Sequence, residues 1–392
     1  MSTLRFAGVL RRLPADLGAG EGAAAAPGAK KGGRLDVVDT FRGLAVLSVM
    51  AFHFTVALTR PLFRLDSYHY DGRFPGWLEA GRYGVHVFFV ISGLVIALTL
   101  VRSKTALEFA GRRFARIYPA FLFAVSLALV TTAMDGPPFG PRGLGDYVAN
   151  LTLLAPHLGR PWIDESYWTL LVEAKFYCVC GLAYVVLRRN FWIGLIGYCA
   201  LAAAVAQHWT WGAHVWLFSD LTPYFLAGVS AWLFCCERRR RAAGLCLAVS
   251  LLLEAYYNFG LPRTCAFQGV CLHLAPDTVA WAYLAATIGG LLLLLAAGVR
   301  RGIGPLTWVG RISYSLYLVH AFLGLWVIRT LKAAHVPDLA ALAGAVMISF
   351  AVATLMFTFV EEPGHRFLLR LPQRLARRAA TAQGEGAAAD TI

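Results

Sequence analysis

The sequence predicts an all-α membrane protein that crosses the bilayer many times. Hydrophobic residues make up 58% of the 392 residues, charged residues make up 15%, and the mean hydropathy is +0.60. Apolar windows long enough to span a bilayer as helices recur along most of the chain. They lack the alternation of apolar and polar residues that is typical of transmembrane β-barrels. These observations favour a polytopic helical bundle.

About ten apolar windows account for most of the chain. Each is long enough, or nearly so, for a helix that rises 1.5 Å per residue to cross the hydrocarbon layer. We therefore expect spanning helices near residues 37–58, 83–101, 114–133, 167–187, 191–207, 215–235, 242–257, 277–299, 306–328 and 339–360.

The basic residues predict how these helices are oriented. With a cytoplasmic N-terminus, 25 of the 36 lysines and arginines fall in cytoplasmic segments, 9 in outside loops and 2 within spans, at Arg42 and Lys175. Cytoplasmic loops carry an excess of basic residues, so both termini are expected in the cytoplasm and the protein in the cell (inner) membrane. The net charge of +14 is then a topology signal and an attraction to anionic lipid, not a sign of nucleic-acid binding.

Polar segments flank the expected membrane domain. Residues 1–33 are rich in Ala, Gly and basic residues and predict a flexible cytoplasmic tail, while residues 34–362 form the membrane domain. Residues 363–392 predict a basic cytoplasmic C-terminal tail whose first part lies on the inner membrane surface. Cys265 and Cys271 share an outside loop, but spacing alone does not decide whether they pair. Trp162, Tyr167 and Trp168 are interpreted as an interfacial aromatic belt rather than a sugar-binding platform.

Two ionisable residues share the first apolar window and call for a functional explanation. Charged side chains are costly in hydrocarbon, so their presence on one spanning helix marks a functional site by default. His53 follows Arg42 by eleven residues, which is roughly 16 Å along a helix axis. Arg42 is therefore expected near the cytoplasmic face, with His53 well below it.

Six segments in order carry a resemblance to a known family. They are LDVVDTFRGLAVLSVMAFHF, YGVHVFFVISGLVIAL, RRFARIYPAF, SYWTLLVEAKFY, GRISYSLYLVHAF and FVEEPGHRF. Together they resemble the acyltransferase 3 family of membrane-bound O-acyltransferases over roughly residues 34 to 367. The resemblance implies transfer of an acyl group, usually acetyl, from cytoplasmic acyl-CoA to a hydroxyl of an extracytoplasmic glycan or glycolipid.

The resemblance also implies which residues act. The arginine–histidine pattern of the family matches Arg42 and His53, and its pair of arginines matches Arg113 and Arg116. Other matches to family motifs are Glu173, His320 and Glu361.

The chemistry of these residue types agrees with such a reaction. A histidine with a pKa near neutrality can take the proton of an attacking hydroxyl, and His53 is the candidate base, although an acyl-histidine intermediate is an alternative. Glu173 and His320 are candidate catalytic partners. Arg42, Arg113 and Arg116 are candidate ligands for the CoA phosphates. Asp39 and Glu361 are expected to be structural partners of arginines.

The same residues also allow other functions. Intramembrane charges on ten helices also allow a secondary transporter of a glycan precursor or acyl compound, although no internal repeat supports it. A third hypothesis keeps the acyltransferase and changes the acceptor to a small secondary metabolite. No metal-ligand spacing and no P-loop are present, so acetyl-CoA is expected as a donor substrate, with no permanently bound cofactor and no metal.

Overall fold

The computed structural model describes residues 35–56, 75–135, 143–209, 216–218, 220–257 and 278–371, and these residues form helices and connecting turns without a strand. The first half contains α2 (Asp36–Phe54), η4 (Gly76–Tyr83), α3 (Gly84–Arg102), α4 (Ala106–Asp135), α5 (Leu144–Leu151), α6 (Trp168–Leu187) and α7 (Phe191–His208). The second half contains α9 (Thr222–Cys235), α10 (Arg240–Ala255), α11 (Thr278–Leu284), α12 (Gly290–Ala296), α13 (Gly304–Arg311), α14 (Ser313–Ala333) and α15 (Asp338–Met356).

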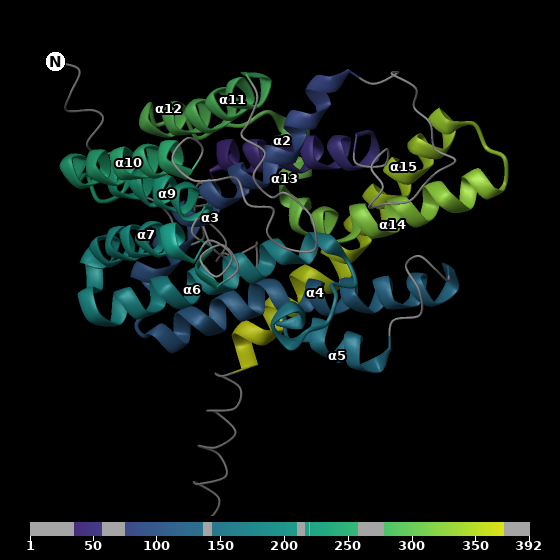
Figure 1. Ribbon diagram of the computed structural model, residues 1–392, viewed down its shortest axis with the longest axis horizontal. Coiled ribbons are helices and arrows are strands. Elements are labelled where there is room, and N and C mark those ends of the chain that lie inside the picture. The colour runs from purple at the N-terminus through teal and green to yellow at the C-terminus, as the bar shows by residue number, and fades with distance from the viewer. Residues whose placement is uncertain are drawn as a thin grey trace, which may run out of the picture.

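Helix α2 is packed among elements from both ends of the chain. It contacts η4 and α3, which follow it, and α13 and α14, which are more than 250 residues away (Figure 1). α3 packs on α9, α9 on α10, and α14 on α15. The histidine of the first apolar window is thereby brought next to the late helices.

Glycines allow α2 and α13 to approach closely. A Cβ on Gly310 would lie 1.8 Å from the carbonyl oxygen of Asp39, and one on Gly43 would lie 2.2 Å from the carbonyl oxygen of Leu306. Small residues at such crossings are typical of packing between membrane helices. Hydrogen bonds add to this contact, because Thr40 Oγ1 lies 3.0 Å from Thr307 Oγ1 and accepts from the Ile303 N–H at 3.0 Å. The start of α2, including Arg42, is thus held against α13.

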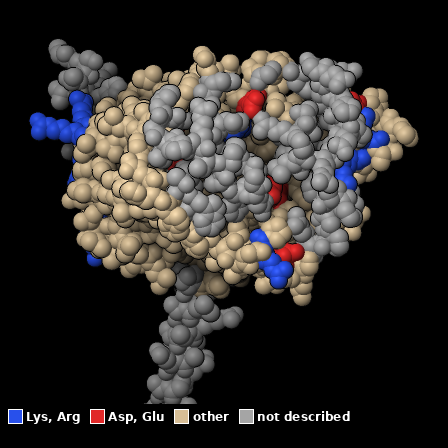
Figure 2. Space-filling model, in the orientation of Figure 1, with Lys and Arg blue, Asp and Glu red and all other residues tan. Residues whose placement is uncertain are grey.

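The described surface is that of a membrane protein. Among the described residues visible in Figure 2, most are uncharged, and the charged side chains are gathered at a few places. Large apolar side chains are more than 60% exposed on several helices, a state that is costly in water and favourable in lipid. Examples are Leu182, Val186, Leu252, Leu293, Met347 and Phe359.

Within the described residues, seven helical stretches are long and apolar enough to cross a membrane. They are Asp36–Phe54, Trp77–Arg102, Ala106–Met134, Glu165–His208, Thr278–Ala296, Ser313–Ala333 and Asp338–Leu371. The stretch Glu165–His208 contains both α6 and α7, which were expected as two separate spans. α9 and α10 are shorter, with 14 and 16 residues. An all-helical multi-pass membrane protein is confirmed, whereas the count of ten spans and the location of the termini remain predictions.

Three sequence expectations differ from the structure. The window 306–328 was expected as one helix, but the chain breaks at Ile312 into α13 and α14. The aromatic belt was wrong for Trp162 and Tyr167, which are 1% and 0% exposed and therefore do not face lipid headgroups. The last helical stretch continues past residue 360, where the expected span ends, through Pro363 to Leu371. Cys265, Cys271 and the tails at residues 1–33 and beyond 371 lie outside the described residues, so those expectations stay predictions.

Candidate active site

Arg113 and Arg116 lie one turn apart on α4, and neighbouring helices hold both guanidinium groups. Arg113 is 7% exposed, donates to Thr99 Oγ1 on α3 and lies 5.6 Å from the ring centre of Tyr177 on α6. Its Nε is shielded from solvent and has no hydrogen-bond partner among the described residues. A buried donor without a partner is costly, so this arginine is suited to receive a further ligand.

Arg116 forms an ion pair with a carboxylate from the end of α15. Arg116 donates to Glu361, whose other oxygen accepts from Ser315 Oγ at 2.5 Å. Glu361 ends a π-helical turn, Phe357–Glu361, that directly precedes Glu362 and Pro363. A proline lacks the N–H of a regular helix, and a widened turn accommodates that loss. The expectation that Asp39 and Glu361 are partners of arginines is confirmed, since Arg42 lies 3.9 Å from Asp39.

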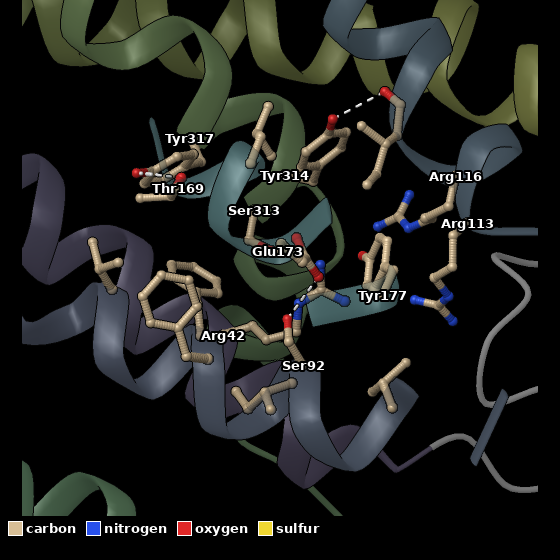
Figure 3. A pocket seen from close by; sticks show the side chains of 17 residues that line it. Arg42, Ser92, Arg113, Arg116, Thr169, Glu173, Tyr177, Ser313, Tyr314 and Tyr317 are labelled. Atoms are coloured by element: carbon tan, nitrogen blue, oxygen red, sulfur yellow. Dashed lines mark hydrogen bonds between the residues drawn. The ribbon is translucent and has the colours of Figure 1, made fainter. Parts of the chain in front are cut away.

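A cavity opens beside these arginines. It has a volume of about 820 Å³ including its open mouth, and residues of α2, α3, α4, α6 and α14 line it (Figure 3). The lining residues are Arg42, Val85, Phe88, Phe89, Ile91, Ser92, Val95, Arg113, Arg116, Ile117, Thr169, Leu170, Glu173, Tyr177, Ser313, Tyr314 and Tyr317.

The chemical character of the lining changes along the cavity. Arg113 and Arg116 mark one end, which we call the arginine end, and Thr169 and Tyr317 lie at the other side of Figure 3. On α3 the lining extends from Val95 to Val85, about 15 Å along the helix axis. The three zones are an arginine end (Arg113, Arg116), a polar middle (Arg42, Ser92, Glu173, Tyr177, Ser313) and an apolar end (Val85, Phe88, Phe89, Leu170, Tyr317).

The polar middle contains side chains that can bind a neutral polar ligand. Glu173 accepts a hydrogen bond from Ser92 Oγ at 2.8 Å, shown as a dashed line in Figure 3. Ser313 Oγ also lines the cavity, is shielded from solvent and has no partner in the described part of the chain. Hydroxyl and carboxylate groups of this kind suit the amide and hydroxyl groups of a ligand.

His53 and His320 form a hydrogen-bonded pair. His53 Nδ1 lies 2.9 Å from His320 Nε2, and His320 Nδ1 lies 2.8 Å from the carbonyl oxygen of Tyr317. A carbonyl only accepts, so His320 Nδ1 carries a proton and donates it. In the neutral ring His320 Nε2 then accepts, and His53 Nδ1 must be the donor of their shared hydrogen bond. His53 Nε2 is left unprotonated and able to act as a base.

The structure divides the predicted site residues between two neighbouring places. Arg42, Arg113, Arg116 and Glu173 line the cavity, whereas His53 and His320 do not. Glu173 therefore lies with the arginines and Ser92 rather than beside the histidine pair. Tyr317 joins the two places, because it lines the apolar end and its ring centre lies 5.6 Å from that of His320.

Sequence reasoning missed several lining residues. Tyr314 and Tyr317 precede His320 by two turns and one turn on α14, and this spacing of three residues could have placed them on the same helix face. Phe88 and Phe89 carried no such signal, because an apolar residue in an apolar helix does not reveal whether it faces lipid or a cavity.

The fold and the site define a helical membrane protein with a cavity lined by arginines, hydroxyl groups and apolar side chains. The chain belongs to the acyltransferase 3 family, since the family's sequence model, described as an acyltransferase domain, matches residues 35–360. It is therefore an acyltransferase, which favours the enzyme hypothesis over the transporter.

Curated relatives agree with this membership. The chain is 26% identical over 373 residues to the putative membrane-bound transacylase BcsY of Komagataeibacter xylinus, a match that covers 88% of this chain and 86% of the relative. It is 22% identical over 391 residues to the O-acetyltransferase OatA of Staphylococcus aureus strain MRSA252, covering 88% of this chain and 60% of the relative. A shorter match, 26% over 172 residues, is to nodulation protein 10 of Rhizobium leguminosarum bv. viciae and covers 38% of this chain and 46% of the relative. No solved structure matches.

Proposed function

We propose that this protein transfers an acetyl or other short acyl group from cytoplasmic acyl-CoA to a hydroxyl group of an extracytoplasmic glycan or glycolipid. The observation that carries the proposal is the order of the cavity: Arg113 and Arg116 at one end, a polar middle that includes Arg42, and an apolar end that meets the histidine pair. Similarity to an O-acetyltransferase supports an acetyl group and a hydroxyl acceptor.

The order of the cavity matches the order of groups in acyl-CoA. The phosphates carry negative charge and suit the guanidinium groups of Arg42, Arg113 and Arg116. The pantetheine arm carries amides that suit Glu173 and Ser92. The acyl group is apolar and suits the end lined by Tyr317. A donor bound in this direction brings its thioester close to His53 and His320.

Proton transfer completes the reaction. His53 Nε2 takes the proton of the acceptor hydroxyl while that oxygen attacks the thioester carbonyl carbon. The C–O bond of the new ester forms, the C–S bond breaks, and the proton passes from His53 to the thiolate of CoA. His320 is a positioning residue in this scheme, because it acts on the acceptor only through His53. Direct attack by His53, giving an acyl-imidazole, is the alternative that the assay below separates.

The sidedness of the reaction follows from the proposed topology. Arg42 lies near the start of α2, and His53 lies eleven residues later, so the donor's head and the reacting carbonyl lie at different depths. With cytoplasmic termini in the inner membrane, the CoA head stays inside while the acyl group is delivered to an acceptor that arrives from outside.

The test measures CoA release and acyl transfer by the purified full-length protein in detergent, with radiolabelled acetyl-CoA. His53→Gln is expected to lower turnover by about 10²- to 10⁴-fold, the usual contribution of a general base. Arg116→Gln is expected to raise the KM for acetyl-CoA at least tenfold. Acid quench of the wild type without acceptor tests for label on the protein, because only the acyl-histidine alternative leaves a labelled enzyme.

Matched controls lie on the same elements or have the same side chain. Arg112 is on α4 beside Arg113 but is half-exposed and paired with Glu108, so Arg112→Gln should leave the KM unchanged. His208 is exposed at the end of α7, so His208→Gln should leave turnover unchanged.

A vesicle experiment identifies the acceptor and the side of the membrane on which it is modified. Label from acetyl-CoA added on the cytoplasmic side should appear in a glycan or lipid fraction on the opposite side. Wild-type turnover by both His53→Gln and Arg116→Gln would refute the proposal.

A further inference from the structure

Two aromatic rings line the apolar end of the cavity and contact each other. The Phe88 ring on α3 lies edge-to-face with the Tyr317 ring on α14, with 5.9 Å between their centres. Val85 and Leu170 complete this end from α3 and α6. An edge-to-face pair of this kind adds stability beyond the burial of its surface, so the two rings keep a fixed arrangement. We call Phe88 and Tyr317 the aromatic wall.

Hydrogen bonds hold the Tyr317 side of this wall. The Tyr317 hydroxyl accepts from Thr169 Oγ1 at 3.0 Å and lies 3.3 Å from the carbonyl oxygen of Ser166, to which it donates. Tyr317 is 8% exposed and Thr169 6%. The ring is therefore fixed both at its hydroxyl and at its edge. Phe88 is half-buried and its ring forms no hydrogen bond, so it is less restrained than the ring of Tyr317.

The same wall lies beside the reacting groups. Tyr317 contacts His320, and His320 holds His53. In the proposed donor orientation, the thioester carbonyl meets the histidine pair beside Tyr317, and the carbons beyond it occupy the apolar end between Phe88, Tyr317, Val85 and Leu170.

We infer that Phe88 and Tyr317 form an acyl-length filter that restricts the donor to acetyl-sized groups. The inference rests on the proposed function, because it assumes that acyl-CoA binds with its phosphates at the arginine end. A hydrophobic pocket separates substrates that differ by one methylene by about 10- to 200-fold when size is the difference. Removing one ring of the wall opens space beyond the carbonyl and weakens this discrimination.

The experiment compares kcat/KM for acetyl-CoA, butyryl-CoA and hexanoyl-CoA, measured as CoA release by the purified protein in detergent. The wild type is expected to favour acetyl-CoA over butyryl-CoA at least tenfold. Phe88→Ala should reduce that ratio at least tenfold, through faster use of butyryl-CoA, and Tyr317→Ala should extend the change to hexanoyl-CoA. Phe88→Leu is the milder variant if either alanine variant fails to remain monodisperse.

The matched control is Val95→Ala. Val95 lies on the same helix as Phe88, lines the same cavity and is equally half-buried, but it faces the arginine end. Its acetyl-to-butyryl ratio should stay within twofold of the wild type. A folded Phe88→Ala or Phe88→Leu protein with an unchanged ratio overturns the filter while leaving the proposed function intact. Absence of CoA release from all three donors by the wild type overturns the proposed function and the filter with it.

Discussion

Replacing His320 tests whether this residue acts on the reaction only through His53. In His320→Leu the Nδ1–H of His53 loses its acceptor. A buried donor without a partner costs about 1–3 kcal/mol, and His53 can avoid that cost by moving the proton to Nε2. That tautomer cannot act as the base. A cost of about 1–3 kcal/mol corresponds to a reduction in turnover of about 5- to 150-fold.

The predicted loss is smaller than the loss from removing the base itself. His53→Gln should cost about 10²- to 10⁴-fold, and the double variant should be no slower than His53→Gln alone, because His320 then has no base to orient. His320→Gln offers a side-chain oxygen to His53 Nδ1 and should recover part of the activity lost in His320→Leu.

The assay is kcat for CoA release at saturating acetyl-CoA, with KM measured in parallel. KM should change little in His320→Leu, since the arginine end of the cavity is not altered. Three results would refute the reasoning: a loss in His320→Leu equal to that in His53→Gln, additive losses in the double variant, or no recovery in His320→Gln.

Three further predictions concern stability, each read from thermal unfolding in detergent. Glu361→Gln leaves Arg116 without its buried carboxylate and should lower the free energy of unfolding by about 3 kcal/mol. Glu108→Gln, at the exposed pair with Arg112, should lower it by less than about 1 kcal/mol. Equal effects of the two variants would contradict a stabilising role of the buried ion pair. Gly310→Val places a side chain against the Asp39 carbonyl and should cost about 1–3 kcal/mol; an unchanged midpoint would show that α13 can move away from α2. Burial raises the pKa of Asp164 to about 6, above its value in the unfolded chain. The protonated carboxyl therefore stabilises the folded state at low pH, and this stabilisation is lost as the pH rises from the unfolded pKa through 6. The stability of Asp164→Asn relative to wild type should therefore rise by about 1 kcal/mol between pH 5 and 7.5, and a flat difference would contradict this pKa.

The sequence predicted the membrane class and drew attention to three arginines that line the cavity, because both depend on local signals. Hydropathy marks apolar helices, and charged residues within or beside them stand out, as Arg116 does. The break between α13 and α14 was missed because Ile312 is apolar and residues 311–323 contain neither a proline nor a glycine. Its cause is tertiary: α13 packs on α2 through Gly310, and α14 continues in a separate packing environment.

The burial of Trp162 and Tyr167 was missed for a related reason. Aromatic residues before an expected span are typical of the membrane interface, and hydropathy does not distinguish a ring that faces headgroups from one that faces another helix. Tyr167 packs against Phe121 on α4, with 5.3 Å between ring centres. Only the arrangement of helices, which depends on contacts far apart in the sequence, decides between these two places.

The division between the cavity and the histidine pair explains how one helix can serve both the donor and the acceptor. Arg42 lines the middle of the cavity, while His53 lies on the same helix outside the cavity, where it contacts His320. Because α13 holds the start of α2 and His320 holds its end, the separation between Arg42 and His53 is fixed by two independent contacts. Under the proposed function, a donor anchored at the arginines would bring its thioester to His53 beside Tyr317, so that donor binding and acyl selection would depend on one cavity. The acceptor hydroxyl would then need no access to the arginine end.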